Sequence, residues 1–149
     1  MKIGRFEDIK AWQESRDLTK QIYSITKSYP FNKDYALMDQ VRRASTSIMA
    51  NIAEGFDSNT DAQFISFLSY SQRSASELQS HLYVALDQEY LNQEQFNNLY
   101  QKAAEVKGLI GGFIKYLRSS SKRPRTKDEG LKTKDFGLRT SDEGLRTPD

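Results

Sequence analysis

Residues 96–117, which read FNNLYQKAAEVKGLIGGFIKYL, decide the fold most clearly. Apolar side chains recur along this stretch at steps of three and four residues, at Phe96, Leu99, Ala103, Val106, Ile110, Phe113 and Leu117. That spacing places them on one face of a helix, which is the pattern of a bundle seam. Asn92 precedes the stretch and is a good N-cap residue, so we expect a helix over about residues 93–118.

Three earlier segments show the same period. The first, about residues 7–28, ends before Pro30, and its stripe comprises Ile9, Trp12, Leu18, Ile22, Ile25 and Tyr29. The second, about residues 34–54, is followed by Gly55 as its expected C-cap. The third, about residues 61–88, opens with a capping box in which Thr60 and Gln63 are expected to satisfy each other's backbone amides. No segment alternates with period two, so the sequence predicts an all-α, antiparallel up-down four-helix bundle over residues 1–118.

Residues 119–149 have a different character. Three copies of one heptad follow each other there: TKDEGLK (126–132), TKDFGLR (133–139) and TSDEGLR (140–146). Each copy contains a helix-weakening glycine and too few apolar residues for a coiled-coil seam. We therefore expect a disordered C-terminal tail, with folding on binding to a partner as the alternative.

The net charge of +2 comes from this tail. Residues 1–118 carry 14 basic and 14 acidic side chains, whereas residues 119–149 carry 8 and 6. A neutral bundle argues against a large nucleic-acid footprint, because non-specific affinity comes from many phosphate contacts, but it leaves room for a local basic patch. The candidate nucleic-acid contacts are two adjacent arginines of the second helix and a basic run in the tail: Arg42, Arg43, Lys122, Arg123 and Arg125.

The location is predicted from what the sequence lacks. It contains no cysteine, so it forms no disulfide and no thiolate metal site. The N-terminal residues have no apolar stretch typical of a secretory signal, and no segment is apolar for long enough to span a bilayer. We expect a cytoplasmic protein without membrane contact.

Few residues are suited to catalysis or metal binding. The single histidine, His81, follows Glu77 by one helical turn, and such a pair can take part in a metal site. A di-iron bundle would instead need two Glu-x-x-His motifs, and neither is present. The sequence also lacks a phosphate loop and a nucleophile motif. We therefore favour a structural or surface role for His81, and expect no enzyme, cofactor, metal or small-molecule substrate.

The densest polar signal lies on the second and third helices, at Asn51, Glu54, Arg73 and Glu77. Counting residues from the connecting loop places Arg73 closer to Arg42 than to Glu54. By the same count, Glu77 is well placed to pair with Arg42 or Arg43. We expect an ion pair there that stabilises the helix register, with a ligand-facing role as the alternative. Asn51 and Glu54 are expected to hydrogen-bond to the following loop.

Three glycines interrupt the fourth helix, at positions 108, 111 and 112. Glycine weakens a helix interior, so close approach by another backbone should compensate. Packing within the chain is the favoured explanation, and a subunit contact is the alternative.

Four blocks carry a family resemblance: F-E-D-I-K-A-W-Q at 6–13, Q-V-R-R-A-S-T-S-I at 40–48, A-N-I-A-E-G at 50–55 and F-I-S-F-L at 64–68. Together they resemble the four-helix bundle proteins called 23S rRNA intervening-sequence proteins, over roughly residues 5–118. In that family a proline commonly follows the S-I pair, whereas this chain has Met49, so we expect a straighter second helix. The family is similar to the accessory bundle of diversity-generating retroelements, which forms a pentameric ring and works with a reverse transcriptase and nucleic acid.

Two functions follow as hypotheses. The first is a non-enzymatic scaffold that forms homo-oligomers, pentameric by analogy, and presents aromatic side chains such as Tyr23, Tyr70, Tyr83 and Tyr116. The alternative is an RNA- or DNA-binding accessory protein that acts through basic residues on a homo-oligomeric ring. The resemblance supports this alternative only in part, since the related accessory proteins tend to be strongly basic.

Overall fold

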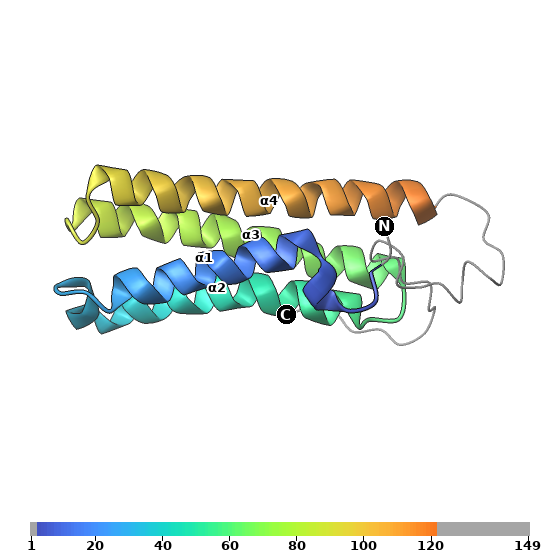
Figure 1. Cartoon of the computed structure of the whole chain (residues 1–149), viewed down its shortest axis with the longest axis horizontal. Coiled ribbons are helices and arrows are strands. Elements are labelled where there is room, and N and C mark those ends of the chain that lie inside the picture. The colour runs from blue at the N-terminus through green and yellow to red at the C-terminus, as the bar shows by residue number, and fades with distance from the viewer. Residues whose placement is uncertain (1–2, 122–149) are drawn as a thin grey trace.

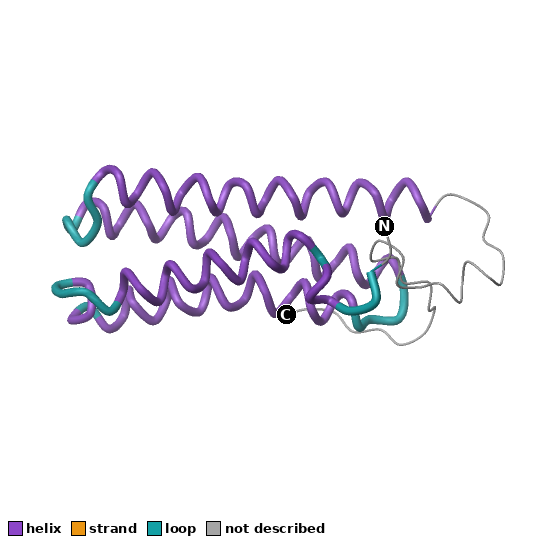
Figure 2. The backbone as a smooth tube through the Cα atoms, viewed as in Figure 1, coloured by secondary structure: helices purple, strands orange, loops and turns teal. Residues whose placement is uncertain are grey.

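The computed structural model describes residues 3–121, which form an up-down bundle of four long helices (Figure 1). The helices are α1 (Lys10–Thr26), α2 (Tyr35–Phe56), α3 (Asp61–Asp87) and α4 (Gln93–Ser121). Two short 3₁₀ helices, η1 (Phe6–Asp8) and η2 (Phe31–Lys33), precede α1 and α2. Short loops at the two ends join antiparallel neighbours, and the described chain contains no strand (Figure 2). The predicted fold class is confirmed.

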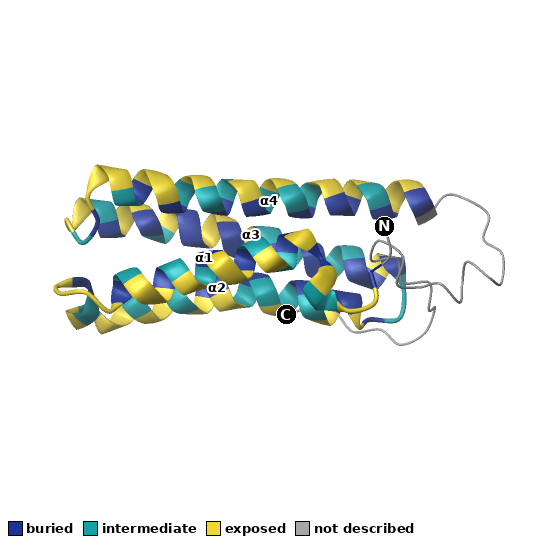
Figure 3. Ribbon diagram, in the orientation of Figure 1, coloured by how far each residue is buried: buried dark blue, intermediate teal, exposed yellow. Residues whose placement is uncertain are grey.

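The predicted apolar stripes form the core of the bundle, and buried positions follow the inner faces of the helices (Figure 3). Leu18, Ile48, Leu78 and Ile110, one from each helix, are completely buried. Tyr29 is the exception, because it lies beyond the end of α1 and 78% of it is exposed.

The first helix begins three residues later than predicted. Ile9 is extended, with φ −78° and ψ 123°, and separates η1 from α1. Its side chain is buried, and the ring of Phe6 packs edge-on against Trp12 with 5.2 Å between centroids. Folding this N-terminal segment onto the bundle therefore buries apolar side chains that a straight helix would carry away from it.

Side-chain caps mark the beginnings of the other helices. Asp34 accepts a hydrogen bond from the Leu37 amide at 3.1 Å and caps α2. Thr60 accepts one from the Gln63 amide, as predicted, but the Gln63 side chain accepts its bond from the amide of residue 59 rather than residue 60. A reciprocal capping box joins Asn92 and residue 95 at 2.8 and 2.9 Å, which confirms Asn92 as an N-cap.

Gly55 does not cap α2, so that prediction is wrong. The helix continues through Phe56, and Asp57 follows as the C-cap. A Cβ atom at Gly55 would lie 2.7 Å from the Phe64 ring and 2.9 Å from Cβ of Phe67. The residue is glycine because α3 packs directly against it.

The four adjacent pairs of helices do not pack equally. The most extensive contact is between α2 and α3, where Ser71 Oγ donates to the carbonyl of Ile48 at 2.8 Å. The hydroxyls of Ser47 and Ser74 also hydrogen-bond across this interface at 2.8 Å. The contact between α1 and α4 is the sparsest of the four.

The C-terminal end of the bundle differs slightly from the prediction. Because α4 continues to Ser121, the described bundle extends past the expected boundary at residue 118. The predicted disorder of the heptad repeats concerns positions outside the described residues. None of the described helices is both long and apolar enough to cross a membrane.

Candidate functional site

A groove runs along the α1–α4 seam near the N-terminal end of α1. Its volume is about 480 Å³, and its lining comprises Ile3, Asp8, Ile9, Lys10, Ala11, Gln13, Gly108, Leu109, Gly112 and Phe113. Gly108 and Gly112 are one turn apart on α4, and apart from the adjoining residues and backbone of α4 itself, no described atom lies within 4 Å of where a Cβ on either would be. We call this the glycine groove.

The polar residues that line the glycine groove are already bound within the chain. Asp8 accepts a hydrogen bond from the amide of Gly4 at 3.2 Å. Lys10 lies 3.2 Å from Glu14 in an ion pair, and the Gln13 amide group donates to the carbonyl of residue 7 at 2.9 Å. Their hydrogen-bonding capacity is therefore partly used at the rim, and the other lining residues are apolar or glycine.

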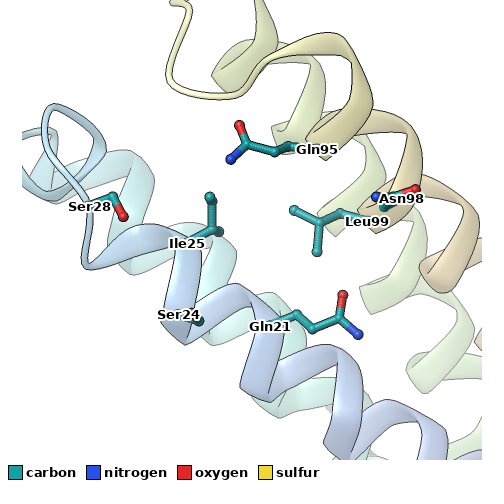
Figure 4. A pocket seen from close by; sticks show the side chains of 7 residues that line it. All are labelled: Gln21, Ser24, Ile25, Ser28, Gln95, Asn98 and Leu99. Carbon is teal, nitrogen blue, oxygen red and sulfur yellow. The ribbon is translucent and has the colours of Figure 1, made fainter.

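A second, smaller groove opens at the other end of the same seam (Figure 4). It has a volume of about 270 Å³ and is lined by Gln21, Ser24, Ile25, Ser28, Gln95, Asn98 and Leu99. Ile25 and Leu99 point into the space between the helices, and uncharged polar side chains surround them (Figure 4). No charged group lines this groove among the described residues.

Between the two grooves, Lys102 of α4 bridges to α1. Its ammonium donates a hydrogen bond to Glu14 and lies 3.3 Å from Asp17 and 3.5 Å from Glu105. Hydrogen bonds from Lys102, and then from Lys10, lower the pKa of Glu14. The hydrogen bond to Glu14 in turn raises the pKa of Lys102. Both groups are therefore charged at neutral pH, and they hold α1 against α4.

A basic groove lies on another side of α1, toward α2. It has a volume of about 450 Å³ and is lined by Arg16, Thr19, Lys20, Tyr23, Ser24, Lys27 and Met49, of which only Met49 belongs to α2. Within residues 3–121, neither Lys20 nor Lys27 forms an ion pair. We call this the basic groove. Sequence reasoning missed it as a unit, although Arg16, Lys20, Tyr23 and Lys27 recur at helical spacing.

Arg42, a predicted nucleic-acid contact, lies beside this groove. Its Nε donates to Thr26 Oγ1 at 2.9 Å, and its guanidinium lies over the Tyr23 ring, 4.5 Å from the centroid. Arg43 instead forms an ion pair with Asp39 at 2.7 Å and is largely exposed. The structure therefore brings one of the two predicted arginines to a basic surface and pairs the other with an acid. Lys122, Arg123 and Arg125 lie outside the described residues.

The polar cluster predicted at residues 51, 54, 73 and 77 is divided between separate contacts. Asn51 donates to the carbonyl and hydroxyl of Ser47 on its own helix, at 2.9 and 3.1 Å, rather than to the following loop. Arg73 lies over the ring of Tyr70, 4.6 Å from its centroid. Glu54 is exposed near the end of α2, and it also interacts with another group.

The predicted ion pair between Glu77 and Arg42 or Arg43 is wrong. Glu77 lies 3.5 Å from Nε2 of His81, one turn along α3, while Arg42 bonds to α1. Counting residues from the loop estimates depth along the bundle but not the direction in which a side chain points. Within the described residues, no group of three or more acidic and histidine side chains is arranged to hold a metal ion.

The glycines of α4 also differ from expectation. Packing within the chain explains only Gly111, whose Cβ would lie 3.1 Å from the side-chain nitrogen of Gln72. Gly108 and Gly112 face open space, so the favoured prediction is wrong for these two.

Comparison with known proteins agrees with this architecture. The family model described as 23S rRNA-intervening sequence protein matches residues 7–112. No curated protein matches the chain. The crystal structure of a protein with unknown function from the S23 ribosomal protein family of Bacteroides thetaiotaomicron is similar, with 26% sequence identity and a TM-score of 0.65. The match covers 70% of this chain and 98% of that one. With its match to the family model spanning most of the bundle, the chain belongs to the 23S rRNA-intervening sequence protein family.

Proposed function

We propose that this protein is a non-enzymatic scaffold that assembles with copies of itself through the glycine groove. The observation that carries the proposal is the open space at Gly108 and Gly112. A glycine inside a helix lowers its stability by about 1 kcal/mol relative to alanine. Because no contact in the described chain requires glycine at these two positions, a contact with another molecule is the simplest reason for them.

The lining of the groove favours a protein partner over a substrate. Small-molecule sites combine an apolar pocket with a few polar groups that converge on the ligand. Here Asp8, Lys10 and Gln13 are bound to their own chain at the rim. The remaining surface is apolar or glycine, and glycines let the backbone of a second helix approach closely.

A second copy is the partner that we propose. The family resemblance points to a ring-forming bundle, and a groove along one seam of each copy could receive a helix of the next copy around a ring. Five copies is the number that the retroelement analogy suggests. The cytoplasmic location expected from the sequence belongs to the same proposal.

Sedimentation velocity of the full chain over a range of concentrations tests this proposal. We expect a species larger than the monomer, and we expect Gly112→Leu, which fills the groove, to shift the population toward monomer. Gln101→Leu is the control, because it adds the same side chain at an exposed position of α4 outside the groove. A strict monomer at the highest concentration, or equal assembly of both variants, would contradict the proposal.

A further inference from the structure

We infer that the basic groove between α1 and α2 binds the phosphate backbone of a nucleic-acid strand. This inference is independent of self-assembly, because it concerns a different side of α1. The observation behind it is a stripe of three exposed cations, Arg16, Lys20 and Lys27, which lines one groove together with Tyr23.

Charge is segregated around α1 although the bundle as a whole is neutral. The acidic side chains of the helix, Glu14 and Asp17, are turned to α4, where both contact Lys102. The cations that line the basic groove have no such partner within residues 3–121: Lys20 and Lys27 form no ion pair there, and Arg16 contacts the ring of Trp12 at 5.9 Å. A positive surface therefore exists where the total composition shows none.

Asp39, the acidic residue of α2 nearest Arg42 and Arg43 in the sequence, does not neutralise this surface. Asp39 is 2.7 Å from Arg43 and is committed to that ion pair. Arg42 adds a further cation at the edge of the groove, held in place by Thr26 and by the Tyr23 ring. Because these contacts fix its guanidinium, little side-chain entropy is lost when it binds a phosphate.

The dimensions of the stripe fit a nucleic-acid strand. Arg16 and Lys27 are eleven residues apart, which is about 16 Å along a helix. Successive phosphates advance by about 3.4 Å along one strand of a duplex, so the stripe covers roughly five nucleotides. Tyr23 is 37% exposed between the cations, and aromatic rings stack on bases without regard to sequence.

The same lining argues against a membrane partner. Apart from Tyr23 and the three cations, the groove is lined by two hydroxyl side chains and by the half-buried Met49. It therefore presents no cluster of exposed aliphatic or aromatic side chains that could enter the acyl region of a bilayer. An acidic protein segment is the competing occupant, and the test below distinguishes it.

Fluorescence anisotropy with the full chain tests the inference. The probes are a labelled 15-nucleotide single-stranded RNA and the DNA of the same sequence, titrated at several salt concentrations. We expect Lys20→Gln/Lys27→Gln to weaken binding roughly 60-fold at about 50 mM salt. Each lost phosphate contact lowers the slope of log affinity against log salt by about 0.7, so two lost contacts lower it by about 1.4. Between a reference of about 1 M salt and about 50 mM salt, that difference in slope amounts to roughly 60-fold. Binding of either probe supports the inference, and comparison of the two identifies the preferred sugar.

Two controls isolate the groove. Arg43→Gln/Lys115→Gln removes two cations outside it, one already paired with an acid, and should change affinity by less than about threefold. Lys122→Gln/Arg123→Gln/Arg125→Gln removes the basic run of the tail and should leave the slope difference caused by the groove variant unchanged. Circular dichroism confirms that every variant is folded.

Three results would overturn the inference. The first is no measurable binding at low salt. The second is an unchanged affinity and salt slope in the groove variant. The third is competition by polyglutamate as effective as competition by unlabelled RNA, which would assign the groove to acidic protein segments instead.

Discussion

Lys102 on α4 donates a hydrogen bond to Glu14 on α1, and these two helices form the sparsest contact of the four adjacent pairs in the bundle. The side chains are 17% and 21% exposed, so water screens them only in part. The pair lies between the glycine groove and the smaller groove near Leu99. The bridge therefore fastens an otherwise loosely packed seam at its middle.

Removing the ammonium should loosen this seam. We expect Lys102→Met to lower the free energy of unfolding by about 1–2 kcal/mol, because Glu14 keeps a partly buried charge without its main partner. Urea unfolding followed by circular dichroism measures the change. Lys115→Met, an exposed position of the same helix, is the control and should change stability by less than about 0.5 kcal/mol. Equal effects of the two changes would show that the bridge contributes nothing.

The bridge should also make the free energy of unfolding depend on pH in the acidic range. Because the pKa of Glu14 is below its ordinary value in the folded chain, its contribution is complete above the unfolded pKa. That contribution is lost as the pH falls through the folded pKa. We expect the stability difference between the wild type and Glu14→Gln to be constant near neutral pH and to shrink as the pH falls below the ordinary glutamate pKa of about 4.5. Urea titrations from neutral to acidic pH test the prediction, and a difference that stays constant throughout would refute it.

Two glycine-to-alanine changes should alter the free energy of unfolding in opposite directions. Gly55→Ala places a Cβ 2.7 Å from the Phe64 ring in the core, which should cost about 1–3 kcal/mol. Gly112→Ala meets open space inside a helix and should stabilise the monomer by about 0.5–1 kcal/mol. Thermal unfolding at low protein concentration compares them. A loss of stability in both variants would show that Gly112 is also packed within the monomer.

The sequence predicted the four helices because apolar spacing reports directly which face is buried. It was less informative about helix ends. A glycine after a stripe usually marks a C-cap, but at Gly55 the close approach of Phe64 and Phe67 is the reason for the residue, and that contact is not visible in local sequence. Ile9 was likewise counted as helical, because its apolar character fits both a helix stripe and the extended, buried conformation that it adopts.

Side-chain partners were harder to predict than the fold. Arg42 was expected to pair across to α3, but its guanidinium turns to Thr26 and Tyr23 of α1. The rotation of a helix about its own axis decides such a choice, and residue counts from a loop contain no information about it. The basic groove could have been predicted in part, because Arg16, Lys20 and Lys27 have helical spacing. Its positive charge also depends on Glu14 and Asp17 pairing with Lys102 of α4, which the sequence does not show.

Asp34 connects the start of α2 to the loop between α3 and α4. One carboxylate oxygen caps α2, and the other accepts a hydrogen bond from the Tyr90 hydroxyl at 3.0 Å. This bond raises the pKa of Tyr90, since the carboxylate favours the protonated phenol. We expect Asp34→Asn to bring the pKa of Tyr90 back toward its ordinary value. Ultraviolet titration of the wild type, of this variant and of Tyr90→Phe separates the Tyr90 signal, and an unchanged titration would contradict the prediction.

The family resemblance implies a proline at position 49, whereas this chain has Met49 and α2 runs without a break through it. A proline there would remove the helical bond from the amide of residue 49 to the carbonyl of Ser45. In this chain the Thr19 hydroxyl donates to the carbonyl of Ser15 at 2.8 Å and shares its one proton with the Ser45 carbonyl at 3.2 Å, so the Ser45 acceptor would keep a weaker partner. A proline inside a helix ordinarily costs about 3 kcal/mol or more.

We therefore expect Met49→Pro to lower the free energy of unfolding by less than about 3 kcal/mol, and by more when Thr19 is replaced by valine. A double-mutant cycle of Met49→Pro and Thr19→Val, measured by urea unfolding, gives the coupling directly. The expected coupling is about 0.5–1.5 kcal/mol, in the sense that the proline is tolerated better with the threonine hydroxyl present. A coupling of zero would mean that the Ser45 carbonyl gains nothing from α1. The cross-helix hydroxyl would then have no part in tolerating proline at this position.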